Sequence, residues 1–172
     1  HYFDGFVPDD NGHATKIPQV ICMHEEDYGI LWKHTDLEGN PDTRRSRRLV
    51  VSYFSTIGNY DYGFFWYFYL DGSIQVEAKA TGIVFVGANE PGTVDPHATE
   101  IAPAVFAPIH QHLFCARIDV AIDGEDNTLH EIEAVGIPMG PDNPYGNAFT
   151  WSNTQLKTEQ DAQRVAHRLA SR

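Results

Sequence analysis

The chain has 172 residues, of which 42% are hydrophobic, and a formal net charge of −12 at pH 7. This length and composition suit one globular domain with a core of its own. The negative charge argues against nucleic acid and anionic membranes as partners, because both would repel the protein. No apolar run approaches the ~20 residues that span a bilayer. The two cysteines, Cys22 and Cys115, are too few to predict a disulfide framework or a compartment.

The first half of the chain predicts several strands. Residues 1–20 are rich in Pro, Asp, Asn and Gly and predict a loop. Residues 48–57 and 62–70 are rich in β-branched and aromatic side chains, and they predict two strands separated by Gly58-Asn59. The dipeptide Asp71-Gly72 predicts a tight turn. Residues 74–86 alternate apolar and polar side chains at first and predict the next strand.

The second half predicts further strands and one helix. Residues 87–109 contain four prolines and predict a loop. The apolar run at 112–123 predicts a strand buried on both faces, with residues 129–137 as its return partner. Near the end, Thr158 and the acidic residue three positions later predict a helix start, followed by an apolar stripe that ends at Leu169. The fold class is therefore antiparallel all-β with one short C-terminal helix.

The strongest local indication of a metal is His110-Gln111-His112. In an extended strand, side chains at i and i+2 point to the same face, so both imidazoles could converge on one ion. Imidazole suits copper, zinc, iron or nickel. The same spacing also occurs in solvated or core histidine pairs. A cupin-like site would need a further carboxylate, for which Asp119 is poorly spaced. The residues alone leave these alternatives open.

Charged and aromatic runs have structural interpretations. The four arginines within residues 44–48 predict a salt-bridged face rather than an anion-binding patch. The acidic residues 25–27 predict a turn rather than a pair of catalytic carboxylates. The aromatic run at 64–69 predicts packing in a core or an interface rather than a cofactor site.

Three stretches together resemble the copper-containing primary amine oxidases. They are ICMHEEDYGILWKHTD at 21–36, RRSRRLVVSYFSTIGNYDYGFFWYFYLDGSIQVEAKATGIVF at 44–85 and HQHLFCARIDVAIDG at 110–124. The centre is Asn59-Tyr60-Asp61, which matches the Asn-Tyr-Asp/Glu motif of the family. The resemblance implies that Tyr60 is the precursor of topaquinone, formed by the enzyme itself with copper and dioxygen. A bound cation favours deprotonation of a neighbouring phenol, which suits that chemistry.

The resemblance also implies the other members of the site. Asn59 would hold the orientation of the quinone, and Asp61 follows in the same motif. His110 and His112 match the first two copper ligands. Asp119 and the main-chain carbonyl of Val120 match a peripheral site for calcium or another cation, for which oxygen ligands are suitable.

The family implies a larger catalytic β-sandwich, usually a homodimer, that oxidises primary amines with dioxygen to aldehyde, ammonia and hydrogen peroxide. We therefore expect residues 1–172 to be a partial catalytic domain. The third copper ligand is expected beyond Arg172. The catalytic aspartate, a gating tyrosine and the disulfide partner of Cys22 are expected ahead of His1. The chain alone is then expected to lack turnover. A non-catalytic β module, binding a partner or a metal weakly, is the alternative from another class.

Overall fold

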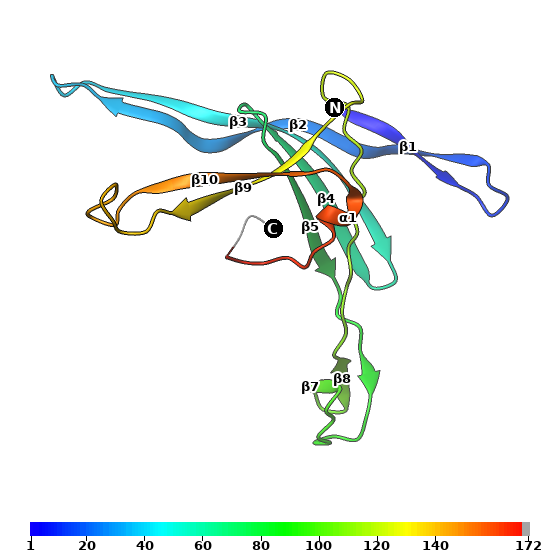
Figure 1. Ribbon diagram of the computed structural model, residues 1–172. Helices are drawn as coiled ribbons and strands as arrows, with labels where there is room; N and C mark the ends of the chain where they lie inside the picture. The colour runs from blue at the N-terminus through cyan, green and yellow to red at the C-terminus, as the bar shows by residue number, and fades with distance from the viewer. Residues whose placement is uncertain (170–172) are drawn as a thin grey trace. The chain divides into compact units, whose positions relative to one another are not determined.

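Figure 1 shows the computed structural model, which describes residues 1–169. Within these residues the chain forms ten strands and one short helix, and the pairing of the strands is antiparallel. The all-β prediction with one short C-terminal helix is confirmed. The chain divides into two compact units, His1–Phe114 and Cys115–Arg172, and each is described by itself. In the described part, the only helix is far too short to cross a membrane.

The first unit contains a five-stranded sheet in which each strand pairs with the next along the chain. Its strands are β1 (Tyr2–Pro8), β2 (Ala14–Thr35), β3 (Pro41–Ile57), β4 (Tyr60–Tyr69) and β5 (Ile74–Gly82). Strand β4 lies between β3 and β5 and is hydrogen-bonded to both. The core sits here, because Val50 of β3 and Tyr67 of β4 are only 1% and 3% exposed.

The strands predicted around the aromatic run are confirmed with shifted ends. Residues 48–57 fall within β3, β4 contains residues 62–69 of the strand predicted over 62–70, and the strand predicted over 74–86 ends at Gly82. The turn at Asp71-Gly72 is also confirmed. Gly72 has a φ of 85°, and the N–H of Tyr69 donates to the carbonyl of Ser73 at 3.0 Å. Glycine adopts such a positive φ without steric cost.

The loop predicted over residues 1–20 is wrong, because these residues form β1 and the start of β2. Proline is compatible with both strands. Pro8 ends an edge strand, and Pro18 lies where the register between β1 and β2 shifts. Only residues 9–13 form a turn, in which the carboxylate of Asp9 accepts hydrogen bonds from main-chain N–H groups.

The loop predicted over 87–109 is right for residues 89–97 and wrong for most of the rest. These residues contain a small sheet of β6 (Gly87–Ala88), β8 (Val105–Pro108) and β7 (Ala98–Ala102), in that order. Figure 1 shows β7 and β8 beyond the end of β5. The carboxylate of Glu100 organises the connections, since it accepts hydrogen bonds from the N–H groups of Gly92 and Ala104 at 3.0 and 3.1 Å.

In the second unit, the strands pair differently from the prediction. Strand β9 (Leu129–Gly136) is present, but its partner is β10 (Phe149–Leu156). The strand predicted at 112–123 is wrong, because these residues, all of them described, form no regular element and Leu113 is 90% exposed. A strand needs a hydrogen-bonded neighbour, and this run has none in the described part of the chain. Buried Asn143 holds the β9–β10 connection by donating to the carbonyl of Ile137 at 2.8 Å.

The helix begins as predicted but is much shorter. In α1 (Glu159–Ala162), Thr158 and Asp161 form a reciprocal capping box. The apolar stripe was expected to extend the helix to Leu169. Instead, the helix ends at Ala162 and Val165 is 88% exposed, so this stripe is not buried. A helical turn without tertiary packing is marginal in water.

Candidate functional site

The N-terminal end of β4 presents aromatic rings on one face. Side chains alternate across a strand, so Tyr60, Tyr62 and Phe64 share a face while Asp61 and Gly63 point the other way. The segment at residues 110–114 repeats the same spacing with rings at every second position. These rings are His110, His112 and Phe114, all within the first unit.

The two sets of rings interleave. The ring of Tyr60 lies 5.7 Å from that of His110 and 4.8 Å from that of His112. The ring of Tyr62 lies 5.7 Å from that of His112 and 5.6 Å from that of Phe114. Residues 50 positions apart in the sequence are thus brought into contact, and the predicted tyrosine meets both predicted histidines.

The hydroxyl of Tyr60 lies 2.9 Å from Nε2 of His110. Nδ1 of the same imidazole lies 2.8 Å from the carbonyl of Pro108, which can only accept a hydrogen bond. In the neutral imidazole, Nδ1 therefore carries the proton and Nε2 accepts from the hydroxyl of Tyr60. The N–H of Phe85 donates to the same hydroxyl oxygen at 3.3 Å. The phenol is held between a donor and an acceptor.

The two imidazole rings suit a metal as a partial ligand set. Their centroids lie 4.6 Å apart, so both side chains are on the same side although the segment is not part of a regular strand. Imidazole nitrogens are suitable copper ligands. Among residues 1–169, no group of three or more His, Cys, Asp or Glu side chains is placed to hold an ion. The two imidazoles are therefore a candidate pair of ligands.

Asn59 and Asp61 position the main chain on either side of Tyr60. The carbonyl of Asn59 accepts a hydrogen bond from the N–H of Ile83 at 2.8 Å. The carboxylate of Asp61 accepts from the hydroxyl of Thr56 at 2.5 Å, on the opposite face of β4. Both contacts tie the start of β4 to its neighbours.

Gly82 is a site residue that the sequence reasoning missed. It pairs with Tyr60 across β4 and β5, and its φ is 101°. A Cβ atom at this position would lie 2.5 Å from the carbonyl oxygen of Asn59 and 2.7 Å from the amide nitrogen of Asp61. Only glycine allows this approach without a backbone shift. In the sequence, the indication is a glycine inside the strand predicted over 74–86, because such a glycine suggests a close approach of two backbones.

The predicted peripheral cation residues, Asp119 and Val120, lie in the second unit between residues 115 and 128, where the chain is irregular. The side-chain amide of Asn127 donates to the carbonyl of Val120 at 3.0 Å and to that of Gly124 at 2.9 Å. This amide holds in place the carbonyl of Val120, which is the predicted cation ligand.

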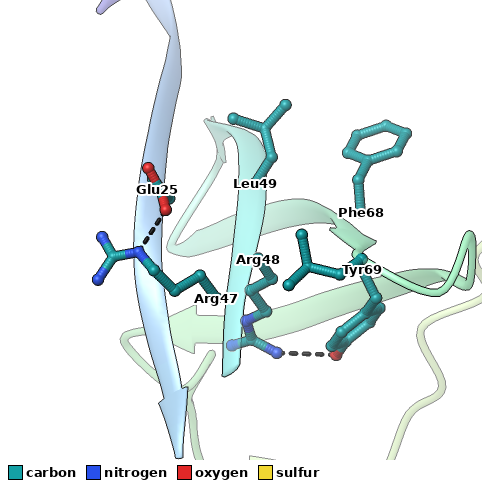
Figure 2. Close-up of a pocket in the computed structure, with 7 residues that line it drawn as sticks. Glu25, Arg47, Arg48, Leu49, Phe68 and Tyr69 are labelled. Carbon is teal, nitrogen blue, oxygen red and sulfur yellow. Dashed lines mark hydrogen bonds and ion pairs between the residues drawn. The ribbon is translucent and has the colours of Figure 1, made fainter. Parts of the chain in front are cut away.

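A hollow at the C-terminal end of β4 is held together by contacts among its own lining residues (Figure 2). It is lined by Glu25, Arg47, Arg48, Leu49, Phe68, Tyr69 and Leu70. Arg47 pairs with Glu25, and the guanidinium of Arg48 donates to the hydroxyl of Tyr69 at 2.9 Å. The carbon at the centre of the Arg48 guanidinium also lies 3.8 Å from the ring centroid of Tyr67. Burial opposes the charge of Arg48, but hydrogen bonds to Tyr69 and Glu26 raise its pKa.

The arginine cluster is confirmed as a salt-bridged face. Its pairs are Arg44 with Asp42, Arg45 with Asp27, Arg47 with Glu25 and Arg48 with Glu26. The turn predicted for residues 25–27 is wrong, because they lie within β2 and their carboxylates face the arginines of β3. The aromatic run at 64–69 packs as predicted, with stacked pairs such as Tyr53 on Phe64.

Comparison with known proteins identifies similar sequences and structures. The chain is 56% identical over 166 residues to a histamine oxidase of Arthrobacter globiformis, covering 96% of this chain and 24% of that protein. It is 43% identical to a primary amine oxidase of Arthrobacter sp. strain P1, covering 99% of this chain and 26% of that protein. The crystal structure of a copper-containing benzylamine oxidase from Hansenula polymorpha matches with a TM-score of 0.77 and 33% identity, over 91% of this chain and 25% of that one.

The chain thus spans about a quarter of the length of the curated relatives that it matches. The sequence profile of the family described as copper amine oxidase, enzyme domain, matches residues 1–172. The chain therefore belongs to the copper amine oxidase family.

Proposed function

We propose that residues 1–172 supply part of the catalytic domain of a primary amine oxidase that depends on copper and topaquinone. The reaction is oxidation of a primary amine by dioxygen to an aldehyde, ammonia and hydrogen peroxide. One observation carries the proposal: the hydroxyl of Tyr60, in the Asn-Tyr-Asp motif, lies 2.9 Å from Nε2 of His110 and beside the ring of His112. Membership of the copper amine oxidase family supports it.

On this proposal Tyr60 is the residue converted to topaquinone, and His110 and His112 hold the copper through their ring nitrogens. Bound copper supplies the redox chemistry for this conversion and for the reduction of dioxygen. Before copper binds, Nε2 of His110 and the N–H of Phe85 hold the phenol beside the metal position; with Nε2 on the copper, the contact with the N–H of Phe85 would remain. Asn59 and Asp61 keep the start of β4 in place through their contacts with Ile83 and Thr56.

The substrate class is a primary amine. Similar proteins carry the names histamine oxidase and primary amine oxidase, which supports this class. The net charge of −12 attracts a cationic substrate such as a protonated amine over a long range.

Two further parts of the proposal concern a cation and a partner. Asp119 and the carbonyl of Val120 contribute oxygen ligands to a peripheral cation, such as calcium. The functional enzyme is a homodimer. Its support is the exposure of large apolar side chains on β1 and β2, including Phe6 at 67% and Ile30 at 59%, because such side chains are usually covered in a finished assembly.

The test uses the full-length protein that contains this chain, prepared without copper and then exposed to copper and air. We expect a mass gain in the peptide that contains Tyr60, a coloured product with phenylhydrazine, and peroxide release with methylamine or benzylamine. The Tyr60→Phe variant should bind copper but give no colour. An unchanged peptide mass at Tyr60, or equal colour in the variant, would contradict the proposal. The chain by itself is expected to give no turnover, because its described residues supply only two nitrogen ligands.

A further inference from the structure

We propose that Tyr62 is a positioning residue that orients the imidazole of His112 toward the copper. This inference rests on the proposed function, since it takes His112 to be a copper ligand. It assigns a role to a side chain outside the Asn-Tyr-Asp motif.

The contact between the two side chains is direct. The hydroxyl of Tyr62 lies 2.5 Å from Nδ1 of His112. Tyr62 is only 8% exposed, and its ring packs edge-on against Phe114 at 5.6 Å between centroids. The packed ring fixes the place of the hydroxyl. The hydroxyl in turn fixes the rotation of the imidazole.

The chemistry of imidazole decides what this contact does. A neutral imidazole has one N–H and one nitrogen lone pair, and only the lone pair binds a metal. A phenol oxygen can accept a hydrogen bond from Nδ1–H, which leaves the lone pair on Nε2 of His112. His110 shows the same arrangement, because its Nδ1–H donates to the carbonyl of Pro108 at 2.8 Å. Both histidines thus keep the lone pair on Nε2 for one ion, which in His110 would replace the hydrogen bond from Tyr60.

A second buried tyrosine on the same strand separates this role from simple packing. Tyr67 is 3% exposed, and its hydroxyl donates to Oε2 of Glu77 at 2.6 Å. It faces the opposite side of β4 from Tyr62, because the two positions differ by an odd number. Removing either hydroxyl deletes one buried hydrogen bond, but only Tyr62→Phe leaves a histidine nitrogen without its partner. Tyr67→Phe is therefore the matched control.

The test measures copper affinity in a Tyr60→Phe background of the full-length protein, in which no quinone forms. Competition with a chelator gives the affinity. Loss of an outer partner of a metal-bound histidine typically costs about 10–100-fold in affinity. We expect Tyr62→Phe to weaken copper binding by about this factor and Tyr67→Phe to leave it unchanged.

A spectroscopic readout tests the contact itself. Electron spin-echo modulation of bound Cu²⁺ reports on the remote nitrogen of each ligating imidazole and responds to the hydrogen bond at that nitrogen. Tyr62→Phe should change the modulation from the imidazole of His112 alone, and Tyr67→Phe should leave the modulation from every ligating imidazole unchanged. If Tyr62→Phe fails to fold, ring-fluorinated tyrosine at position 62 keeps the hydroxyl but makes it a weaker acceptor, and the modulation should still shift.

The outcomes distinguish the two proposals. If His112→Ala loses copper while Tyr62→Phe keeps the affinity and the modulation of its parent, the role of Tyr62 is overturned and the copper site stands. If His112→Ala binds copper as tightly as its parent, the copper assignment of the proposed function fails, and the role of Tyr62 fails with it.

Discussion

The two ends of β4 use tyrosine hydroxyls in different ways. At the N-terminal end, the hydroxyls of Tyr60 and Tyr62 lie 2.9 and 2.5 Å from ring nitrogens of His110 and His112. At the other end, Tyr67 contacts a carboxylate and Tyr69 contacts a guanidinium. A hydrogen bond to a charged group is about twice as strong as one between neutral groups. One strand thus combines an end held by charged partners with an end at which, on the proposed function, imidazoles would exchange a hydrogen bond for a metal.

The largest expected effect comes from removing an imidazole at the N-terminal end of β4. His110→Ala should lower copper affinity by more than the ~10–100-fold that loss of an outer partner costs, because a direct ligand is removed. Chelator competition on the copper-free full-length protein measures the change. His130→Ala is the control, since that imidazole contacts Asn153 in the second unit. Equal losses in the two variants would contradict the assignment.

The next effect concerns the glycine opposite Tyr60. Gly82→Ala should lower the free energy of unfolding by roughly 1–3 kcal/mol from backbone strain, with a further loss from the clash with the main chain of β4. Urea unfolding gives the value. Gly72→Ala is the matched control, because its φ is also positive but its Cβ would meet no atom within 4 Å. A smaller loss at Gly82 than at Gly72 would show that the close approach is unimportant.

A third change removes a charged partner at the C-terminal end of β4. Arg48→Met should lower the free energy of unfolding by roughly 1–2 kcal/mol, since it removes a partly buried ion pair and cation–π contacts with Tyr67 and Tyr28. Copper affinity should stay unchanged. The exposed Arg44→Met should have little effect on stability. A loss of copper affinity in Arg48→Met would mean that the two ends of β4 are coupled.

The smallest effect depends on pH. The hydrogen bond from Arg45 holds the pKa of Asp27 well below its ordinary value of 3.8. The ionised Asp27 therefore stabilises the fold above about pH 4, and this contribution is lost as the pH falls through the lowered pKa. The difference in melting temperature between the parent and Asp27→Asn should narrow from pH 5 toward pH 2. A constant difference would rule out the ion pair as its cause.

Local patterns predicted the strands around the site well. Alternation, aromatic content and Asp71-Gly72 identified the β3–β4–β5 region, because these features act over a few neighbouring residues. The family resemblance singled out Tyr60 and both histidines. The role of Tyr62 was missed because it depends on contact with a residue 50 positions away, which no local period encodes.

Two of the wrong predictions, at residues 112–123 and after α1, share a physical cause. The apolar run at 112–123 has strand-like composition, but a strand also needs a neighbour that accepts its hydrogen bonds. The stripe that ends at Leu169 has helical spacing, but a helix of this length needs a surface against which to bury its apolar face. Composition describes what an element can do, and tertiary partners decide whether it forms.

The ion pairs between β2 and β3 also have a consequence for folding. Side chains on a strand alternate with a period of two, so a slip of one residue moves every side chain to the other face. Such a slip would separate Glu26 from Arg48, which are directly opposite in the native pairing. Glu25 and Asp27 would lose their arginine partners at the same time. Strands of 22 and 17 residues offer many shifted alignments, and a shift by one residue breaks all three of these native ion pairs at once.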